Sequence, residues 1–131
     1  MKKLSKKGLQ RKADALWSLK IRTRDPICRL CKSRPTKHAH HIIDRRHKAV
    51  RLLLANGLGL DSGCHFYIEG LFKADRYDPF KHRELYWDCI TNIIGVEEYE
   101  ELLRLSKIRV KYNERFIEEA IKKLEGKDGQ D

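Results

Sequence analysis

The sequence predicts an α+β domain in which two short strands and a helix form a small metal-stabilised core, flanked by a basic N-terminal helix and by C-terminal helices. Three observations lead to this class. Residues 28–69 contain three of the four cysteines and five of the six histidines, a concentration of metal ligands that packing does not explain. Apolar residues recur at helical spacing on both sides of this stretch. The length of 131 residues is that of one domain.

The single domain 1–131 divides into a basic helix and arm (1–24), the metal-stabilised core (25–75) and a helical tail (80–125). Apolar residues make up 40% of the chain and charged residues 37%, so the hydrophobic core should be small. Small domains of reducing compartments are more often stabilised by zinc than by disulfides. No apolar run approaches the roughly 18 residues of a membrane span, and no apolar signal segment follows the basic start. We expect a soluble, cytoplasmic protein without a membrane partner.

The formal charge of +10 is unevenly distributed along the chain. Residues 1–96 carry 21 Lys and Arg against 9 Asp and Glu, whereas residues 97–131 carry 8 against 10. A basic surface beside a cysteine and histidine cluster favours nucleic acid as the partner. The alternative is that the charge only aids solubility.

The N-terminal helix is predicted from Leu9, Ala13 and Leu16, which fall at helical spacing, with Trp17 adjoining them. The first 24 residues contain nine basic residues and one acid. Asp25-Pro26 should end the helix, because the residue before a proline is disfavoured in the α conformation. We expect one face to contact phosphates and the other to dock on the core through Trp17.

Cys28 and Cys31 form a CxxC knuckle, which can hold one tetrahedral zinc ion from a tight turn. Redox proteins share this spacing. However, no thioredoxin-like βαβ pattern surrounds the motif, and Cys64 returns downstream beside His65. The pattern therefore favours zinc.

The core is predicted as strand, loop, strand and helix. The first strand covers residues 37–43, and Asn56-Gly57 makes the turn into the second strand, 58–60. A helix over residues 63–74 follows, with Ser62 as its N-cap.

Two pairs of residues in this core indicate chemistry. His65 and Glu69 lie one turn apart on one face of the predicted helix. His40 and His41 are neighbours in the strand and therefore point to opposite faces. That geometry makes it difficult for both histidines to bind one ion, as they would in the alternative of a purely structural zinc module.

The tail is predicted to contain helices over residues 80–94 and 96–108 and a third that Asn113 caps, with Gly95 ending the first. No constellation of reactive residues is visible in them, and His82 is expected at the surface. These helices should support the core or form a homodimer interface.

The combined motifs then resemble a known family. Cys28-x-x-Cys31, Ala39-His40-His41-Ile42, Asn56-Gly57 and Cys64-His65 resemble the HNH endonuclease superfamily, which has a ββα-metal fold. The similarity covers residues 13–75 and is greatest to small phage-type HNH proteins, including recombination and junction nucleases. It implies a metal-dependent DNA endonuclease that hydrolyses phosphodiester bonds in duplex or branched DNA. The alternative is a zinc-stabilised DNA-binding or recombination accessory module without catalysis.

The resemblance also implies a role for each residue. His41 is the general base, since a neutral imidazole can take a proton from water near pH 7, and Asn56 orients this imidazole by a hydrogen bond. His40 and His65 match metal-binding positions, where one divalent ion would act on the scissile phosphate.

The chain departs from the family pattern in its second knuckle, where Asp61 replaces the usual first cysteine. The structural zinc is therefore expected to bind Cys28, Cys31, Cys64 and Asp61. Cys89 or His38 could replace Asp61 as the fourth ligand.

A second departure is Glu69, which stands where close relatives tend to have histidine. With His40 and His65 it would complete the catalytic metal site, and its oxygen favours Mg²⁺ or Mn²⁺, with Ni²⁺ or Zn²⁺ as alternatives. The competing interpretation is a solvated glutamate on a helix surface.

The basic helix and the basic loop after the first strand supply the expected DNA contacts. These residues are Lys12, Lys20, Arg22, Arg45, Arg46, His47 and Lys48.

Overall fold

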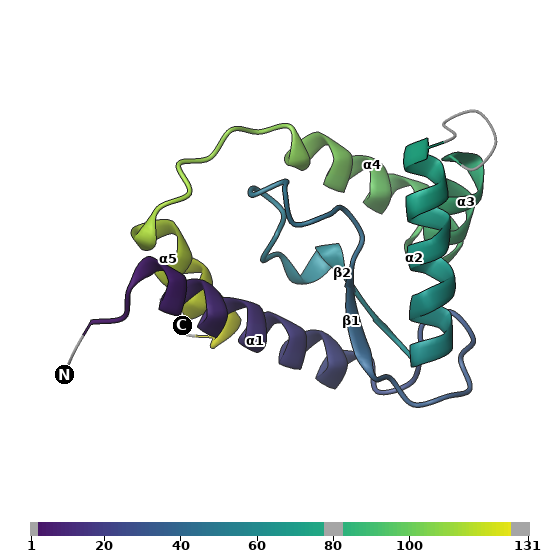
Figure 1. The fold of residues 1–131 in the computed structure, drawn as a ribbon, viewed down its shortest axis with the longest axis horizontal. Coiled ribbons are helices and arrows are strands. Elements are labelled where there is room, and N and C mark those ends of the chain that lie inside the picture. The colour runs from purple at the N-terminus through teal and green to yellow at the C-terminus, as the bar shows by residue number, and fades with distance from the viewer. Residues whose placement is uncertain (1–2, 78–82, 127–131) are drawn as a thin grey trace.

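The computed structural model describes residues 3–77 and 83–126. Within these ranges the chain has five helices and one two-stranded antiparallel hairpin, which confirms the α+β class (Figure 1). None of the described helices is long and apolar enough to span a membrane. The elements are α1 (Lys6–Arg24), β1 (His38–His41), the 3-10 helix η1 (Leu54–Asn56), β2 (Gly57–Leu60), α2 (Ser62–Tyr77), α3 (Arg83–Ile94), α4 (Val96–Ser106) and α5 (Glu114–Leu124). The expected positions 80–82, with His82, lie outside the described residues.

Helix α1 begins at Lys6, so most of the predicted basic helix and arm (1–24) is helical. The Ser5 hydroxyl accepts a hydrogen bond from the backbone N–H of Gly8 at 3.1 Å, and this N-cap draws Lys6 and Lys7 into the helix. Its buried stripe consists of Leu9, Ala13, Trp17 and Ile21. The helix ends at Arg24, directly before Asp25-Pro26, as predicted.

The hairpin pairs His40 with Leu58 and His41 with Gly57. Strand β2 is buried along its whole length, because α1 covers Gly57 on one face while Leu58 and Leu60 pack into the cluster with α2–α4 on the other. A methyl group added at Gly57 would come within 2.4 Å of Ile21 Cδ1, so only glycine fits there. The predicted Asn56-Gly57 turn is instead the end of η1, from which the chain passes straight into β2.

Helix α2 begins one residue before its predicted start, and its N-cap is Asp61 rather than Ser62. The Asp61 carboxylate accepts a hydrogen bond from the backbone N–H of Cys64 at 2.9 Å. The backbone carbonyl of Asp61 accepts one from the backbone N–H of His65, also at 2.9 Å. Ser62 is the first helical residue. A carboxylate at the N-cap also complements the positive end of the helix dipole.

The break at Gly95 and the cap at Asn113 are confirmed, whereas α4 ends at Ser106, two residues before its predicted end. Gly95, with φ of 94°, separates α3 from α4, and Asn113 caps α5 by accepting from the Phe116 N–H at 2.9 Å. Helix α3 packs on α2, whereas α5 returns to lie beside α1 (Figure 1). The protein therefore has two apolar clusters, one between the hairpin and α2–α4 and one between α1 and α5.

Candidate functional site

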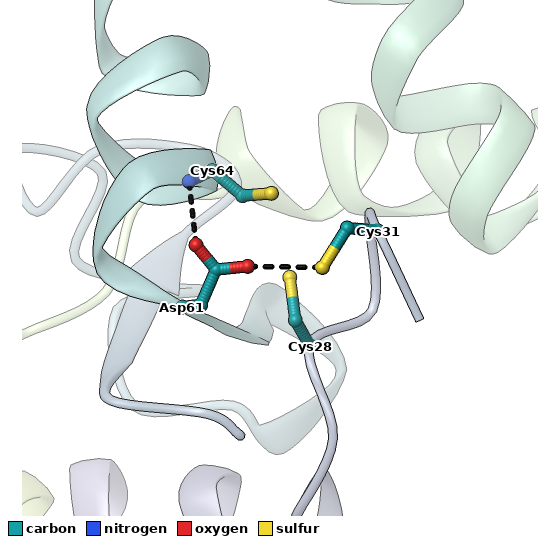
Figure 2. A group of neighbouring side chains, drawn as sticks. All are labelled: Cys28, Cys31, Asp61 and Cys64. Carbon is teal, nitrogen blue, oxygen red and sulfur yellow. Dashed lines mark hydrogen bonds between the residues drawn. The ribbon is translucent and has the colours of Figure 1, made fainter. Parts of the chain in front are cut away.

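Four side chains converge where the loop after α1 meets the start of α2 (Figure 2). Cys28 and Cys31 come from the loop, and Asp61 and Cys64 come from the first turn of the helix. One ligand atom of each lies within 4.8 Å of all the others. We call these four residues the thiol cluster. The edges of a zinc tetrahedron are about 3.4–3.8 Å for bonds of about 2.1–2.3 Å, so shifts of about 1 Å or less would fit the thiol cluster around an ion.

The knuckle is shaped by its own backbone. The N–H of Cys28 donates to the carbonyl of Arg34 at 2.9 Å, and the N–H of Lys32 donates to the carbonyl of Cys28 at 2.9 Å. Lys32 has a φ of 59°, which is uncommon for a residue with a side chain. This left-handed residue turns the chain sharply after Cys31, so that both thiols face α2.

Asp61 belongs to both the helix and the thiol cluster. One carboxylate oxygen caps α2, while the other lies 3.0 Å from the Cys31 sulfur. Hydrogen bonds from Cys31 and from the Cys64 backbone hold the pKa of Asp61 well below its usual value. Burial and the nearby Asp61 carboxylate raise the pKa of the Cys64 thiol. A bound cation would reverse this effect, because it stabilises thiolates.

The two alternative fourth ligands lie elsewhere. Cys89 packs against the hairpin cluster and lines a separate cavity with Tyr67 and Leu85. His38 contacts the Ser62 hydroxyl at 3.3 Å and stacks on His65 with ring centroids 5.0 Å apart. Asp61 is therefore the residue that the fold brings to the three thiols.

A second group of potential ligands lies beside α2, further from its N-terminus. It consists of His65 and Glu69 of α2 and His40 of β1. Their ligand atoms also lie within 4.8 Å of one another, and we call them the histidine cluster. Glu69 Oε1 is 3.1 Å from His40 Nδ1 and 3.4 Å from His65 Nε2. The i, i+4 spacing places His65 and Glu69 on one face of α2, as predicted, and β1 supplies His40 from the opposite side.

The protonation states of the histidine cluster suit a cation. Burial lowers the pKa of His65, which keeps its imidazole neutral. The contact with the His40 imidazole lowers the pKa of Glu69, which keeps its carboxylate ionised. Neutral imidazoles and a carboxylate are the forms that bind metal ions.

His41 lies on the other face of β1, against α1. Its ring stacks on the Trp17 indole, with centroids 3.9 Å apart and planes inclined by 9°. Its Nε2 lies 3.1 Å from the Arg51 carbonyl oxygen. A carbonyl can only accept, so Nε2 carries the proton and Nδ1 keeps its lone pair. Burial lowers the pKa of His41 to about 4, and the side chain is neutral at pH 7.

Asn56 does not orient His41 directly, contrary to the expectation. The Asn56 side chain is fully buried and bonds the backbone of Ile43 twice, accepting from its N–H and donating to its carbonyl, both at 2.9 Å. These bonds close the long loop between the strands. Since that loop carries the Arg51 carbonyl, Asn56 acts on His41 only through the loop backbone.

Both histidine environments open onto one groove of about 410 Å³, which we call the central groove. His41 and Trp17 line it from one side, and the histidine cluster lines it from the other. A neutral imidazole and a set of three potential ligands therefore face the same space, although His40 and His41 project from opposite faces of the strand.

The predicted phosphate contacts fall into two groups. Arg45 lines the central groove, and Arg46 and Lys48 line its continuation past Asp44 and Glu69. Arg46 is paired with Asp44 at 2.8 Å, and Lys48 lies 5.1 Å above the Tyr112 ring. His47 is exposed in the same loop.

On α1 the predicted contacts are exposed but face different directions. Arg22 donates to the Ser18 hydroxyl at 3.2 Å, and Ser18 lines the central groove. The 100° step between helical residues puts Lys12 and Lys20 on other flanks and puts Arg11, which the sequence did not single out, on the groove flank. Arg22 and Arg11 are thus better placed than Lys12 and Lys20 to contact a phosphate backbone in the central groove.

Sequence reasoning also missed three residues that hold the histidines. Trp17 was identified only as a docking residue, Tyr86 was not singled out in its helix, and Arg51 acts through its backbone. Only for Arg51 did the sequence contain a signal: Asp14 is the one acid in the basic segment, which suggests a basic partner elsewhere in the chain. In the structure that partner is the Arg51 side chain, 2.8 Å away.

Comparisons of the chain with family models, with curated proteins and with solved structures found no match.

Proposed function

We propose that this protein is a metal-dependent DNA endonuclease of the HNH type, with a ββα-metal core. The observation that supports this most is the sharing of the central groove by the neutral imidazole of His41 and the three ligands of the histidine cluster. Hydrolysis of a phosphodiester needs a base for water and a positive charge on the phosphate, and these two groups could supply both at one place.

The chemistry of the histidine cluster fits a divalent ion. His40 is 3% exposed, and its Nδ1 faces a Glu69 oxygen at 3.1 Å. With the imidazole protonated at Nε2, Nδ1 and the carboxylate oxygen are both acceptors, and a cation between them would stabilise the pair. A bound ion would polarise the scissile phosphate and stabilise the charge on the leaving oxygen. The carboxylate favours Mg²⁺ or Mn²⁺, while the imidazoles also admit Ni²⁺ or Zn²⁺.

His41 is proposed to take the proton from the attacking water. Its Nδ1 carries the lone pair because Nε2 donates to Arg51, and stacking on Trp17 restricts the ring to one orientation. Asn56 is a positioning residue, since it closes the loop that holds Arg51. The thiol cluster is proposed to bind a structural zinc ion, because its four ligands leave no position for substrate.

DNA is the proposed substrate because the groove is basic where a backbone would pass. Arg45, Arg46 and Lys48 follow one edge of the central groove and its continuation, and Lys73 follows on α2. The chain as a whole has a formal charge of +10. Such a surface attracts a polyanion independently of its sequence.

The test is cleavage of supercoiled, linear and four-way-junction DNA by the wild type and by His41→Ala, across Mg²⁺, Mn²⁺, Ni²⁺ and Zn²⁺. His41→Ala should cut about 10²–10⁴-fold more slowly, the usual range for loss of a general base. DNA affinity should stay nearly unchanged, because only a neutral group is removed.

The control is Tyr67→Phe, a change at an exposed side chain of α2 that does not line the central groove, and it should leave the cleavage rate within about twofold. Equal cleavage by His41→Ala and the wild type would contradict the assignment of the base. Tight DNA binding without cleavage in any metal would instead favour the zinc-stabilised accessory module.

A further inference from the structure

Tyr86 joins a tail helix to the histidine cluster. Its side chain, from α3, is 2% exposed, and its ring packs edge-on against Phe72 with centroids 5.3 Å apart. The hydroxyl oxygen lies 2.7 Å from the Ile42 carbonyl oxygen and 3.0 Å from His40 Nε2. One hydroxyl group therefore stands between the backbone after β1 and a buried imidazole.

The direction of these two hydrogen bonds follows from their chemistry. A carbonyl oxygen only accepts, so the single hydroxyl proton of Tyr86 is donated to Ile42. The hydroxyl oxygen can then accept a hydrogen bond from the N–H of His40 Nε2. A neutral imidazole has one N–H, so a proton on Nε2 leaves the lone pair of Nδ1 available to bind a metal ion. Nδ1 is also the atom that lies 3.1 Å from a Glu69 oxygen.

We propose that Tyr86 is the positioning residue of His40, fixing its protonated nitrogen and its ring plane so that Nδ1 is presented to a metal ion. The inference rests on the proposed function, since it requires the histidine cluster to bind metal. Metal-ligating histidines generally depend on such a partner at the second nitrogen, and its loss costs about 10- to 100-fold in metal affinity.

This arrangement gives α3 a part in the site. Helix α3 packs on α2, which supplies His65 and Glu69, and Tyr86 reaches past α2 to the ligand on β1. All three ligands are thus held by elements that contact one another. A shift of α3 would move the His40 ring relative to the other two ligands.

Tyr86→Phe tests this inference because it removes the hydroxyl and keeps the ring against Phe72. Calorimetric titration of the zinc-loaded protein with Mn²⁺ should show binding about 10- to 100-fold weaker than in the wild type. The control is Tyr67→Phe, the same chemical change at a 56% exposed tyrosine of α2, which should bind Mn²⁺ as the wild type does.

The ¹⁵N resonances of the His40 ring, recorded with excess diamagnetic Zn²⁺, provide a readout that simple destabilisation would not move. The wild type should show a protonated Nε2 and a metal-bound Nδ1, and Tyr86→Phe should lose this single arrangement. An unprotonated Nε2 in the wild type overturns the inference, even if the variant does not fold. So does equal Mn²⁺ affinity of Tyr86→Phe and the wild type. A wild type that binds no Mn²⁺ overturns the proposed function itself.

Discussion

Helix α2 carries two groups of potential metal ligands, and they are built differently. The thiol cluster consists of the N-cap residue and one first-turn residue of α2, together with two residues from a loop that precedes the hairpin. The histidine cluster takes two residues from the next two turns and one from β1. The first has four ligands, three of them sulfur, and the second has three ligands and opens onto the central groove.

The two clusters differ in their donor atoms and in their number of ligands, and these differences suit two different kinds of metal site. Four ligands that are mainly thiolates suit a closed zinc site, whose binding energy is folding energy. Nitrogen and carboxylate ligands with an open position suit a harder ion that must also meet a substrate. Since Asp61 caps α2, closing the thiol cluster would also fix the helix start on which His65 and Glu69 depend.

The largest expected effect concerns the thiol cluster. Cys28→Ser should abolish tight zinc binding and leave the protein largely unfolded at 37 °C, because Cys28 is 1% exposed and ties the knuckle to α2. Thermal melting by circular dichroism and zinc analysis of the purified protein measure this. Cys89→Ser, a half-buried cysteine outside the thiol cluster, is the control and should keep its zinc. Folded, zinc-free wild-type protein would remove the distinction between the two clusters.

A smaller effect is expected in the histidine cluster. Glu69→Gln should raise the Mn²⁺ concentration for half-maximal cleavage by about tenfold or more, because a charged oxygen ligand is lost. Glu69→His should shift the preference toward Ni²⁺, Co²⁺ or Zn²⁺, since imidazole is the softer ligand. Neither change should alter the zinc content or lower the melting temperature as Cys28→Ser does. Superimposable metal curves for all three proteins would mean that Glu69 is only a solvated helix residue.

A pair of substitutions at Asp61 separates its two contacts. Asn is as good an N-cap as Asp but a weaker metal ligand, whereas Ala provides neither contact. Asp61→Ala should therefore melt about 3–5 °C below Asp61→Asn, the usual effect of a lost cap in a domain of this size. Both variants should bind zinc more weakly than the wild type in a chelator competition. Equal zinc affinity of Asp61→Asn and the wild type would leave Asp61 as a cap only.

The smallest effect distinguishes the surfaces beside the two clusters. If DNA lies along the central groove, Arg45→Ala should reduce the slope of log K against log salt by about one, which corresponds to one phosphate contact. Arg34→Ala, an exposed arginine beside the CxxC knuckle, is the matched control and should leave the slope unchanged. An equal reduction by Arg34→Ala would place the DNA on both sides of α2.

Much of this arrangement was predictable because it depends on local spacing. The i, i+4 pair of His65 and Glu69, the CxxC knuckle and the N-cap Asn113 are properties of short segments, and the structure agrees with each. The opposite directions of His40 and His41 followed from strand geometry. Even Asp61 was identified as a ligand, although its N-cap role was assigned to Ser62. Asp and Ser are both good caps, so the sequence offers no means of choosing between adjacent ones.

Long-range contacts were not predictable in this way. Tyr86 is 46 residues from His40, and its hydroxyl is hidden among apolar residues of a helical stripe. The Arg51 carbonyl that holds His41 is backbone, which any residue would supply. Asn56 was assigned to the His41 imidazole, but only the folded loop reveals that its amide bonds the backbone of Ile43. Such contacts depend on how the elements pack, and that information is not in the spacing of motifs.

The packing of α5 against α1 has a consequence for the order of folding. Arg24 ends α1 and Glu114 begins α5, and 114 − 24 = 90 positions separate them. Contacts between such distant segments form late, because a large loop must close before they can stabilise anything. Trp17 belongs to the α1–α5 cluster and also stacks on His41. We therefore expect the wall of the central groove that holds His41 to become rigid only in the last stage of folding. In hydrogen exchange, the amides of α5 should then gain protection after those of the hairpin and α2, and the protection of α1 should rise further when α5 packs against it.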